Sequence, residues 1–346
     1  MLDIRVQAKR WVGPEWAVTY IGEGESIEAI RTILFPEPPE MDELQQAFLW
    51  QVSALVQKFT GEGDLVVCEL NELVRWSYQG LNTFFTVPQW IRQILEDIDR
   101  PLENILADMN QSMRRKVRQL EKQGFSYLFT QEEEDFDLFY KRMYLPYIPS
   151  RHRGQGMVLR DYESIHNLFT QGGLILVKDG DDPVCGMVCV LEGDTCVAYQ
   201  MGVLDGDFDL VKRGINVALW WFMLLWARDQ GARRFDFGGS RAHTSNGVYN
   251  FKRQWGTRAC IQEDRHTVWS FYAERLPEKL INQLNSLGII AIEDGKFYRV
   301  QVKDPKELSR TANFNRELKQ AAACGLSGLV VLSDDGEKQV IPLASS

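Results

Sequence analysis

Two neighbouring stretches decide the fold: Arg234-Phe-Asp-Phe-Gly-Gly-Ser-Arg241 and Gly247-Val-Tyr-Asn-Phe-Lys-Arg-Gln-Trp-Gly256. The first predicts a buried strand that opens onto a glycine-rich, partly basic turn. The second predicts a short aromatic segment that carries one lysine, Lys252, back toward that turn. In open α/β sheets, ligands bind beyond the carboxyl ends of the strands, where backbone amides and loop side chains converge. We therefore expect a binding site at this turn.

The elements before this strand predict the sheet to which it belongs. Residues 174–178, 184–191 and 195–204 read as three strands joined by short, turn-prone connections, which is typical of an antiparallel meander. An apolar helix over 214–231 leads to the strand at 234–237, and a right-handed crossover places that strand parallel to 195–204. The predicted fold class is therefore α/β (α+β), with a mixed sheet that contains one parallel β-α-β crossover. Repeated βαβ units of a dinucleotide-binding fold are not present in this pattern.

Residues 113–124 predict a basic amphipathic helix, in which Met113, Val117 and Leu120 form an apolar face and Gly124 ends the helix. Arginines and lysines cover its other faces. Outside this central region, we expect a helix over 43–59, a strand over 64–70, a helix over 133–144 followed by a loop, and a mixed α/β segment after residue 260.

Length and composition exclude several classes of protein. The chain has 346 residues, of which 45% are hydrophobic and 25% are charged, so it is long enough for two domains and an appendage. Its net charge of −9 gives no overall attraction to nucleic acid or to anionic membranes, although a local basic patch is compatible with it. The amino terminus lacks the apolar segment of a secretory signal, and charges interrupt every later apolar run. We expect a cytoplasmic protein without membrane insertion, and the sequence leaves its oligomeric state open.

Cysteine and histidine usage argues against a disulfide framework and against a metal site. Six cysteines occur without a C-x-x-C pair, and Cys185 and Cys189 share one face of a predicted strand, as small core residues do. The four histidines have no ligand-like spacing, so no metal is expected.

The order of elements and their sequence resemble the acetyltransferase-like domain of the GNAT superfamily, in the branch of the Fem-type peptidyltransferases and the BioF2-like proteins. Three landmarks carry the resemblance over residues 110–258: the basic helix 113–124, the run Gly231-Ala-Arg-Arg-Phe-Asp-Phe-Gly-Gly239, and Phe-Lys-x-x-Trp-Gly from Phe251 to Gly256. Fem-type proteins carry two such domains, and the length permits a second. We therefore divide the chain into an amino-terminal α/β domain that is a degenerate GNAT-like candidate (1–105), the transferase-like domain (106–272) and an accessory α/β extension (273–346).

The resemblance implies that strands 195–204 and 234–237 splay apart, so that the arm of acetyl-CoA or another acyl-CoA docks between them like an added strand. Gly202 is suited to a bulge that opens the sheet. The following helix start would offer amide donors and a partial positive charge to a diphosphate. GNAT acetyltransferases usually show Arg/Gln-x-x-Gly-x-Gly/Ala there, whereas this chain has one glycine followed by Val217-Ala218, so a solvated helix entry is an equal alternative. The predicted donor-binding residues are Met201, Gly202, Val203, Lys212, Arg213, Gly214 and Asn216.

Three residues are candidates for catalysis. In the resembled family the lysine of the Phe-Lys segment lies near the reacting centre, which implies that Lys252 stabilises the oxyanion formed when an amine attacks an ester or thioester. The alternative is a surface lysine. The Tyr249 hydroxyl is a candidate to protonate the leaving group, or else it packs beside Lys252. His243 is a candidate general base or a solvated loop histidine.

Other residues of the turn and of a second loop are candidates for substrate binding. Gly238 and Gly239 permit close backbone approach, and Asp236, on the opposite strand face from its neighbours, is expected to pair with an arginine or to orient the site. The segment Arg151-His-Arg-Gly-Gln-Gly156 matches the acetyltransferase glycine motif letter by letter, but it follows prolines rather than a strand. Its arginines could line an anionic acceptor. The predicted acceptor-binding residues are Gly238, Gly239, Ser240, Arg241, Arg151 and Arg153.

These residues predict an N-acyltransferase that moves an acyl group directly from acyl-CoA, or a similar activated donor, to a small-molecule or peptide amine. No Ser/His/Asp or Cys/His set for a covalent intermediate is evident. One alternative is a Fem-type transferase that uses aminoacyl-tRNA and a cell-wall precursor, with the basic helix meeting the tRNA. Another is a non-catalytic GNAT-like binding module.

Overall fold

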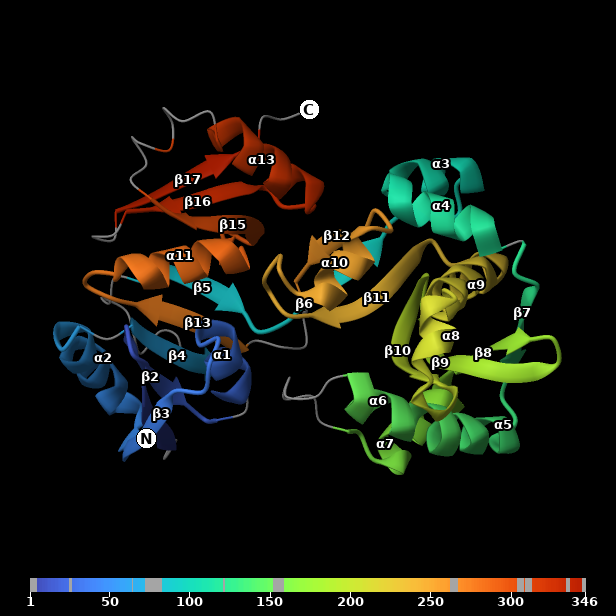
Figure 1. Ribbon diagram of the computed structural model, residues 1–346, viewed down its shortest axis with the longest axis horizontal. Coiled ribbons are helices and arrows are strands. Elements are labelled where there is room, and N and C mark those ends of the chain that lie inside the picture. The colour runs from blue at the N-terminus through green and yellow to red at the C-terminus, as the bar shows by residue number, and fades with distance from the viewer. Residues whose placement is uncertain are drawn as a thin grey trace. The chain divides into compact units, whose positions relative to one another are not determined.

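The computed structural model describes residues 5–24, 27–63, 65–71, 83–120, 122–151, 159–261, 267–303, 308, 313–333 and 337–343. The chain forms two compact units, shown in Figure 1. Unit 1 contains Met1–Ile91, Gly239–Asn250 and Ala259–Ser346, and unit 2 contains Arg92–Gly238 and Phe251–Arg258.

Unit 2 is built on a seven-stranded mixed sheet. Its order is β12 (Arg258–Cys260), β6 (Ile91–Leu95), β11 (Arg234–Ser240), β10 (Thr195–Val203), β9 (Asp182–Glu192), β8 (Gly173–Asp179) and β7 (Phe125–Thr130). Strands β7 to β10 pair antiparallel in succession, and β11 pairs parallel with β10 after the crossover helix α9 (Ile215–Asp229). The predicted meander and the parallel crossover are both confirmed.

Several helices of unit 2 bury apolar side chains in one core with the strands of this sheet. In α4 (Gln111–Leu120), Met113, Val117 and Leu120 are buried, as the spacing predicts, and the Asn110 side chain accepts the backbone N–H of Met113 at 2.8 Å, which caps the helix. Apolar residues occur on every side of α9, and most of them are buried. The other helices are α3 (Leu102–Asp108), α5 (Glu133–Leu138), the π-helix η3 (Phe139–Tyr144), α6 (Leu145–Arg151), α7 (Tyr162–Gln171), the 3₁₀ turn η4 (Leu204–Gly206) and α8 (Phe208–Lys212).

The segment after Tyr144 differs from the prediction. A loop is expected there because of Pro146 and Pro149, but the chain continues directly from the π-helix into α6, with Pro149 inside it. Pro146 lies in the first turn of α6, directly after the π-helix, where the regular hydrogen-bond ladder is already interrupted and a proline costs little.

Gly202 has a different role from the predicted bulge. The register of β10 against β9 shifts between Ala198 and Met201, and Gly202 itself pairs regularly with Gly186. A Cβ atom on Gly202 would lie 2.5 Å from the backbone of Met143 and of Tyr144. The glycine is therefore required because the π-helix η3 crosses β10 at backbone contact.

Unit 1 contains two sheets. The first has the order β3 (Glu40–Phe48), β1 (Arg5–Val12), β2 (Ala17–Gly22), β4 (Leu65–Asn71), β13 (Thr267–Tyr272) and β5 (Phe85–Pro88). The second has the order β14 (Ile290–Glu293), β15 (Lys296–Val302), β16 (Gly328–Leu332) and β17 (Lys338–Pro342). Its helices include α1 (Ile27–Leu34), the 3₁₀ turn η1 (Leu49–Gln51), α2 (Val52–Gly61), α11 (Glu278–Leu287) and α13 (Asn313–Ala323), and α10 (Gly247–Arg253) passes from unit 1 into unit 2.

The first sheet of unit 1 shares its plan with the sheet of unit 2. In both, an antiparallel pair leads to one parallel pair, β2 with β4 and β10 with β11, and two further strands follow on the far side. A helix predicted over 43–59 begins only at Val52, and the prediction for its first part is wrong. Residues 40–48 pair with β1 along its whole length, and this ladder outweighs the helical spacing of their apolar side chains.

The carboxy-terminal segment shares the core of unit 1. One buried cluster joins Trp11 and Trp269 to Tyr298 and Val330, and β13 pairs with both β4 and β5. The compact units therefore differ from the three-part division of the sequence, because β13 completes the sheet begun by β1 and strands of the β14–β17 sheet share its buried cluster.

Candidate active site in unit 2

The parallel pair β10–β11 is short. Three positions pair: Thr195 with Arg234, Cys196 with Phe235 and Val197 with Asp236. Both strands continue beyond this ladder, β10 to Val203 and β11 to Ser240. Figure 1 shows the two strands diverging beyond this shared start. The corresponding pair of unit 1, β2–β4, is in register over five successive residues from Val18 to Gly22. Unit 2 therefore has parted strands at the place where unit 1 has a closed ladder.

Gly238 marks the point at which β11 leaves β10. Its φ is +74°, and a Cβ atom there would lie 3.1 Å from the carbonyl oxygen of Ala198 and 3.8 Å from the Nζ atom of Lys252. A side chain at this position would be strained by the backbone angle and would fill the space in front of the ammonium group. Both the backbone conformation and the available space therefore require a glycine at position 238, the first glycine of the motif.

Lys252 is buried at this point. Its side chain is 5% exposed, and its Nζ atom donates a hydrogen bond of 2.9 Å to the carbonyl oxygen of Gly238. The alternative of a surface lysine is therefore wrong. Burial lowers the pKa of Lys252 to about 7; the charge of Asp236 acts in the opposite direction, and that of Arg92 adds to the lowering.

Asp236 links the turn to a cation from a distant strand. Its Oδ2 atom pairs with Nε of Arg92 at 2.6 Å, and its Oδ1 atom accepts the backbone N–H of Gly238 at 2.7 Å. Burial raises the pKa of Asp236, whereas Arg92, the Gly238 bond and Lys252 oppose that rise. The expected arginine partner of Asp236 is thus confirmed as Arg92, in β6. Nothing in the local sequence of β6 could have identified it.

Two further buried residues hold the end of α10. The Thr257 hydroxyl donates to the carbonyl oxygen of Lys252 at 3.1 Å, and the amide of Gln93 donates to that hydroxyl at 3.4 Å. Both side chains are buried, and neither was a candidate from the sequence. They fix the backbone of Lys252 from strand β6 and from the turn after α10.

Tyr199 lies at the irregular stretch of β10, and sequence reasoning also missed it. Its hydroxyl donates to Glu192 at 2.6 Å. Burial and then the bond to Glu192 raise the pKa of Tyr199 to about 12; the charge of Arg92 lowers it, and that of Asp236 adds to the rise. In the sheet register Glu192 pairs with Thr195 and Asp236 pairs with Val197, two residues further along β10, so these two carboxylates lie on the same face.

Other predicted residues of the turn belong to unit 1: Gly239, Ser240, Arg241, His243 and Tyr249. The Tyr249 side chain is fully buried, and its hydroxyl donates to the carbonyl oxygen of Cys324 at 2.7 Å, so its packing role is the one that the structure supports. Arg241 stacks on Trp90, with its guanidinium carbon 4.0 Å from the ring centre. Ser240 is buried.

His243 differs from a solvated loop histidine. Its Nδ1 atom lies 2.8 Å from the Ser245 hydroxyl, and burial, with the charge of Arg241, lowers its pKa to about 4. The imidazole is therefore neutral at neutral pH, and its low pKa makes it a weak proton acceptor.

The predicted diphosphate site has an unexpected charge balance. Lys212 pairs with Asp209 at 2.8 Å and Arg213 pairs with Asp179 at 2.8 Å, while Asp207 caps α8 by accepting the N–H of Asp209 at 2.7 Å. Gly214, which precedes α9, has a φ of +93°, and the side chain of Asn216 donates to the Tyr147 hydroxyl at 3.4 Å. The other predicted donor-binding residues are Met201, which is half-buried, and Gly202 and Val203, which are buried. Both cations are thus neutralised by carboxylates, which does not favour a doubly charged diphosphate.

Arg153 and the side chain of Arg151 lie outside the described residues, so their predicted role in acceptor binding stays a prediction.

The sequence of this unit matches a known family. A model of the acetyltransferase (GNAT) domain matches residues 107–253, which include β10, β11, the glycine turn and Lys252. The chain contains a domain of the GNAT superfamily. A comparison with curated proteins gives no match.

Several solved structures are similar to this chain at low sequence identity. The crystal structure of FemX is similar at 14% identity and a TM-score of 0.42, over 77% of this chain and 83% of that one. The carboxy-terminal domain of a putative lysylphosphatidylglycerol synthetase from Agrobacterium fabrum is similar at 9% identity and a TM-score of 0.41, over 76% and 79%. L-PGS from Bacillus licheniformis is similar at 12% identity and a TM-score of 0.38, over 80% and 84%.

The residues that the structure describes hold neither a metal-binding cluster nor a membrane-spanning helix. Among them, no cluster of three His, Cys, Asp or Glu residues is arranged to hold a metal ion. No helix in the same residues has the length and apolar character needed to cross a bilayer.

Proposed function

We propose that the chain is an N-acyltransferase that moves an acyl group from a thioester or activated ester directly to an amine. The observation that carries this proposal is the pair of parted strands β10 and β11 with the buried ammonium group of Lys252 at their point of divergence. Parted strands leave backbone donors and acceptors at which an extended acyl arm can pair as an added strand.

In the proposed reaction the amine attacks the acyl carbonyl, an N–C bond forms, and the carbonyl oxygen becomes an oxyanion. The ammonium group of Lys252 stabilises this oxyanion in a site that excludes water. Collapse of the intermediate restores the carbonyl and breaks the C–S or C–O bond, and the proton that the amine nitrogen loses is taken up by the leaving thiolate or alkoxide. Because Gly238 lacks a side chain, the acyl carbonyl can approach Nζ along the direction in which a Cβ atom would stand.

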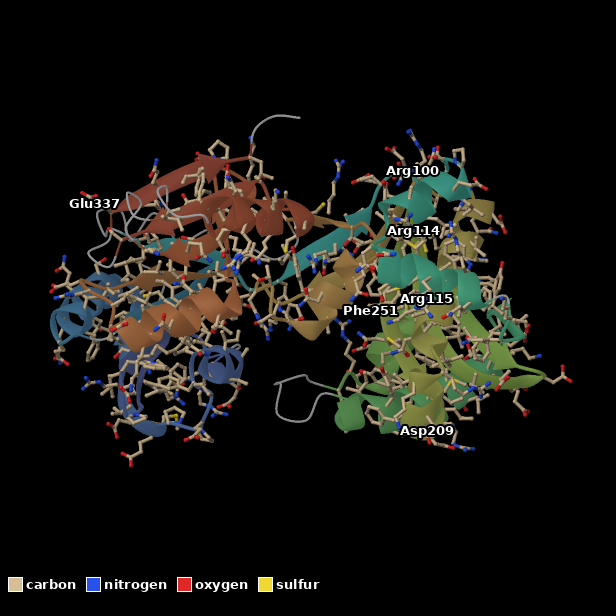
Figure 2. The ribbon with its side chains drawn as sticks, turned by 45° about the horizontal axis from the view of Figure 1, so that its top comes forward. Arg100, Arg114, Arg115, Asp209, Phe251 and Glu337 are labelled. Atoms are coloured by element: carbon tan, nitrogen blue, oxygen red, sulfur yellow. The ribbon has the colours of Figure 1, made fainter. Side chains whose placement is uncertain are left out.

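The identity of the donor defines two candidates. Acyl-CoA follows from the GNAT domain, whereas the paired cations Lys212 and Arg213 and the neighbouring carboxylates disfavour its diphosphate. The second candidate is aminoacyl-tRNA, which the Fem-type resemblance predicts together with a cell-wall acceptor. It is favoured by the exposed basic face of α4, whose cations are Arg115, Lys116, Arg118 and the nearby Lys122. Figure 2 labels Arg115 on this helix.

Thermal-shift measurements followed by transfer assays test the proposal. Acetyl-CoA, longer acyl-CoAs, free CoA and aminoacyl-tRNA are compared, because a donor that binds only the folded chain raises its Tm. A Tm increase with one acyl donor, together with transfer to an amine, supports the proposal. If no donor raises the Tm and none is consumed in the presence of a broad panel of amines, the chain is a non-catalytic member of the fold. Binding of tRNA that weakens steeply with salt would select the second candidate.

A further inference from the structure

The side chain of Arg92 stands beside Lys252 in an arrangement that the transfer chemistry does not use. Its Nε atom is held by Asp236, whose side chain is 3% exposed, while the Arg92 side chain itself is 25% exposed. Within the described residues, Asp236 is the single partner recorded for Arg92. A buried carboxylate therefore anchors the guanidinium of Arg92 through its Nε atom, while the side chain as a whole stays partly exposed.

We propose that Arg92 binds a carboxylate of the acyl acceptor, so that the acceptor is an amine that also carries a carboxylate, as amino acids and peptides do. This inference rests on the proposed function, because it assigns the acceptor of the same site. Two parallel N–H donors on one edge of a guanidinium match the two oxygens of a carboxylate in a bidentate pair. The anchor on Nε sets the plane of the guanidinium before any ligand arrives, which reduces the ordering cost of binding.

The position of Arg92 relative to Lys252 follows from three bonds. Asp236 accepts from Arg92 through one oxygen and from the Gly238 N–H through the other, and the Gly238 carbonyl accepts from Lys252. One carboxylate and one glycine thus separate the two cations. An acceptor held by its carboxylate at Arg92 would have an amine within a few bonds of the acyl carbon that Lys252 addresses.

The charges that surround Arg92 are compatible with an anionic ligand. The charged groups at this point are the partly exposed cation Arg92, the buried cation Lys252 and the buried carboxylate Asp236. The exposed carboxylate of Glu192 lies on the same face but is engaged by the Tyr199 hydroxyl at 2.6 Å. Arg92 also disfavours the charged form of Lys252, so a carboxylate bound at Arg92 would relieve this repulsion and favour the ammonium form.

Matched pairs of amines test the assignment by calorimetric binding and by transfer. Each pair differs only in the carboxylate, as glycylglycine and glycylglycinamide do, and the panel extends to longer amino acids and to aminoalkyl phosphates. We expect wild-type protein to bind the acid of at least one pair 10-fold or more tightly than the amide. Arg92→Met should abolish this preference, and Arg92→Lys should retain a part of it, because lysine keeps the charge but loses the fork.

Arg233→Met is the matched control, since Arg233 forms an exposed pair with Asp99 at 3.5 Å in the same unit. It should leave the preference unchanged. The assignment is overturned if wild-type protein shows no acid preference in any pair, if Arg92→Met keeps the preference while folded, or if aminoalkyl phosphates bind more tightly than the carboxylates. Binding is measured without a donor. An Arg92-dependent preference without any transfer would therefore refute the proposed function and leave the carboxylate site standing.

Discussion

Among single residues, the proposed acyl transfer depends most on Lys252, a lysine whose charge is costly to bury. Lys252 has a pKa of about 7, compared with 10.5 for an unperturbed lysine, and burial is the main cause. Below pH 7 both the folded and the unfolded chain hold the proton, and the penalty for the buried ammonium group is fully present. Between pH 7 and 10.5 the unfolded chain binds more protons than the folded one, so this penalty declines as the pH rises.

Lys252→Met should therefore change stability in a pH-dependent way. The variant removes the buried charge and also the hydrogen bond to Gly238, so its Tm relative to wild type should be more favourable at pH 6.5 than at pH 10. Calorimetric scans of both proteins at the two pH values measure this difference. A Tm difference that is the same at both values would show that Lys252 keeps an ordinary pKa in the folded chain.

At the scale of elements, close packing of η3 on β10 is the feature that glycine makes possible. In Gly202→Ala, the new Cβ atom would meet the backbone of Met143 and Tyr144 at 2.5 Å, so the π-helix would have to move away. We expect a loss of roughly 1–3 kcal/mol in the free energy of unfolding. Gly247→Ala is the control, because nothing lies within 4 Å of its Cβ position and it begins a helix. Urea titration of both variants decides, and equal stabilities would contradict this packing.

Sequence patterns predicted the elements where the pattern and the tertiary contacts agree. The meander, the crossover helix α9, the apolar face of α4 and the glycine turn at Gly238 are local features, so they could be read from spacing and turn residues. Residues 43–48 could not be read in this way, because their strand exists through pairing with β1. The sequence predicts Gly202 in a strand but attributes it to a bulge. Its actual cause is contact with the backbone of η3, which is distant in sequence.

In the candidate site, too, only the residues with a local sequence signal could be predicted. Lys252 and Asp236 could be found from the motif, but Arg92, Gln93 and Tyr199 reach the site from strands that carry no local signal of chemistry. Tyr249 was a candidate because of its position in the motif. Its carbonyl partner at Cys324 lies in a segment that the sequence could not connect to it.

At the scale of the whole molecule, the carboxy-terminal segment is a structural part of unit 1. Residues of β15 and β16 belong to the buried cluster that contains Trp11 and Trp269. A chain that ends at residue 272 should therefore lose the cooperative unfolding of unit 1 and the near-ultraviolet dichroism of these tryptophans, because the cluster would be exposed to water. An accessory extension would behave differently: its removal would leave the calorimetric transition and the dichroism of the remaining chain unchanged.

The turnover of Lys252→Ala is the decisive measurement of whether this lysine stabilises the oxyanion. With the donor identified by the transfer assay, single-turnover rates are compared for wild type, Lys252→Ala and the control Lys141→Ala, whose exposed side chain pairs with Asp137 at 2.7 Å. We predict a loss of about 10²- to 10³-fold for Lys252→Ala, the size expected for one oxyanion donor, and no change for the control. A folded Lys252→Ala protein with the wild-type rate would contradict the account.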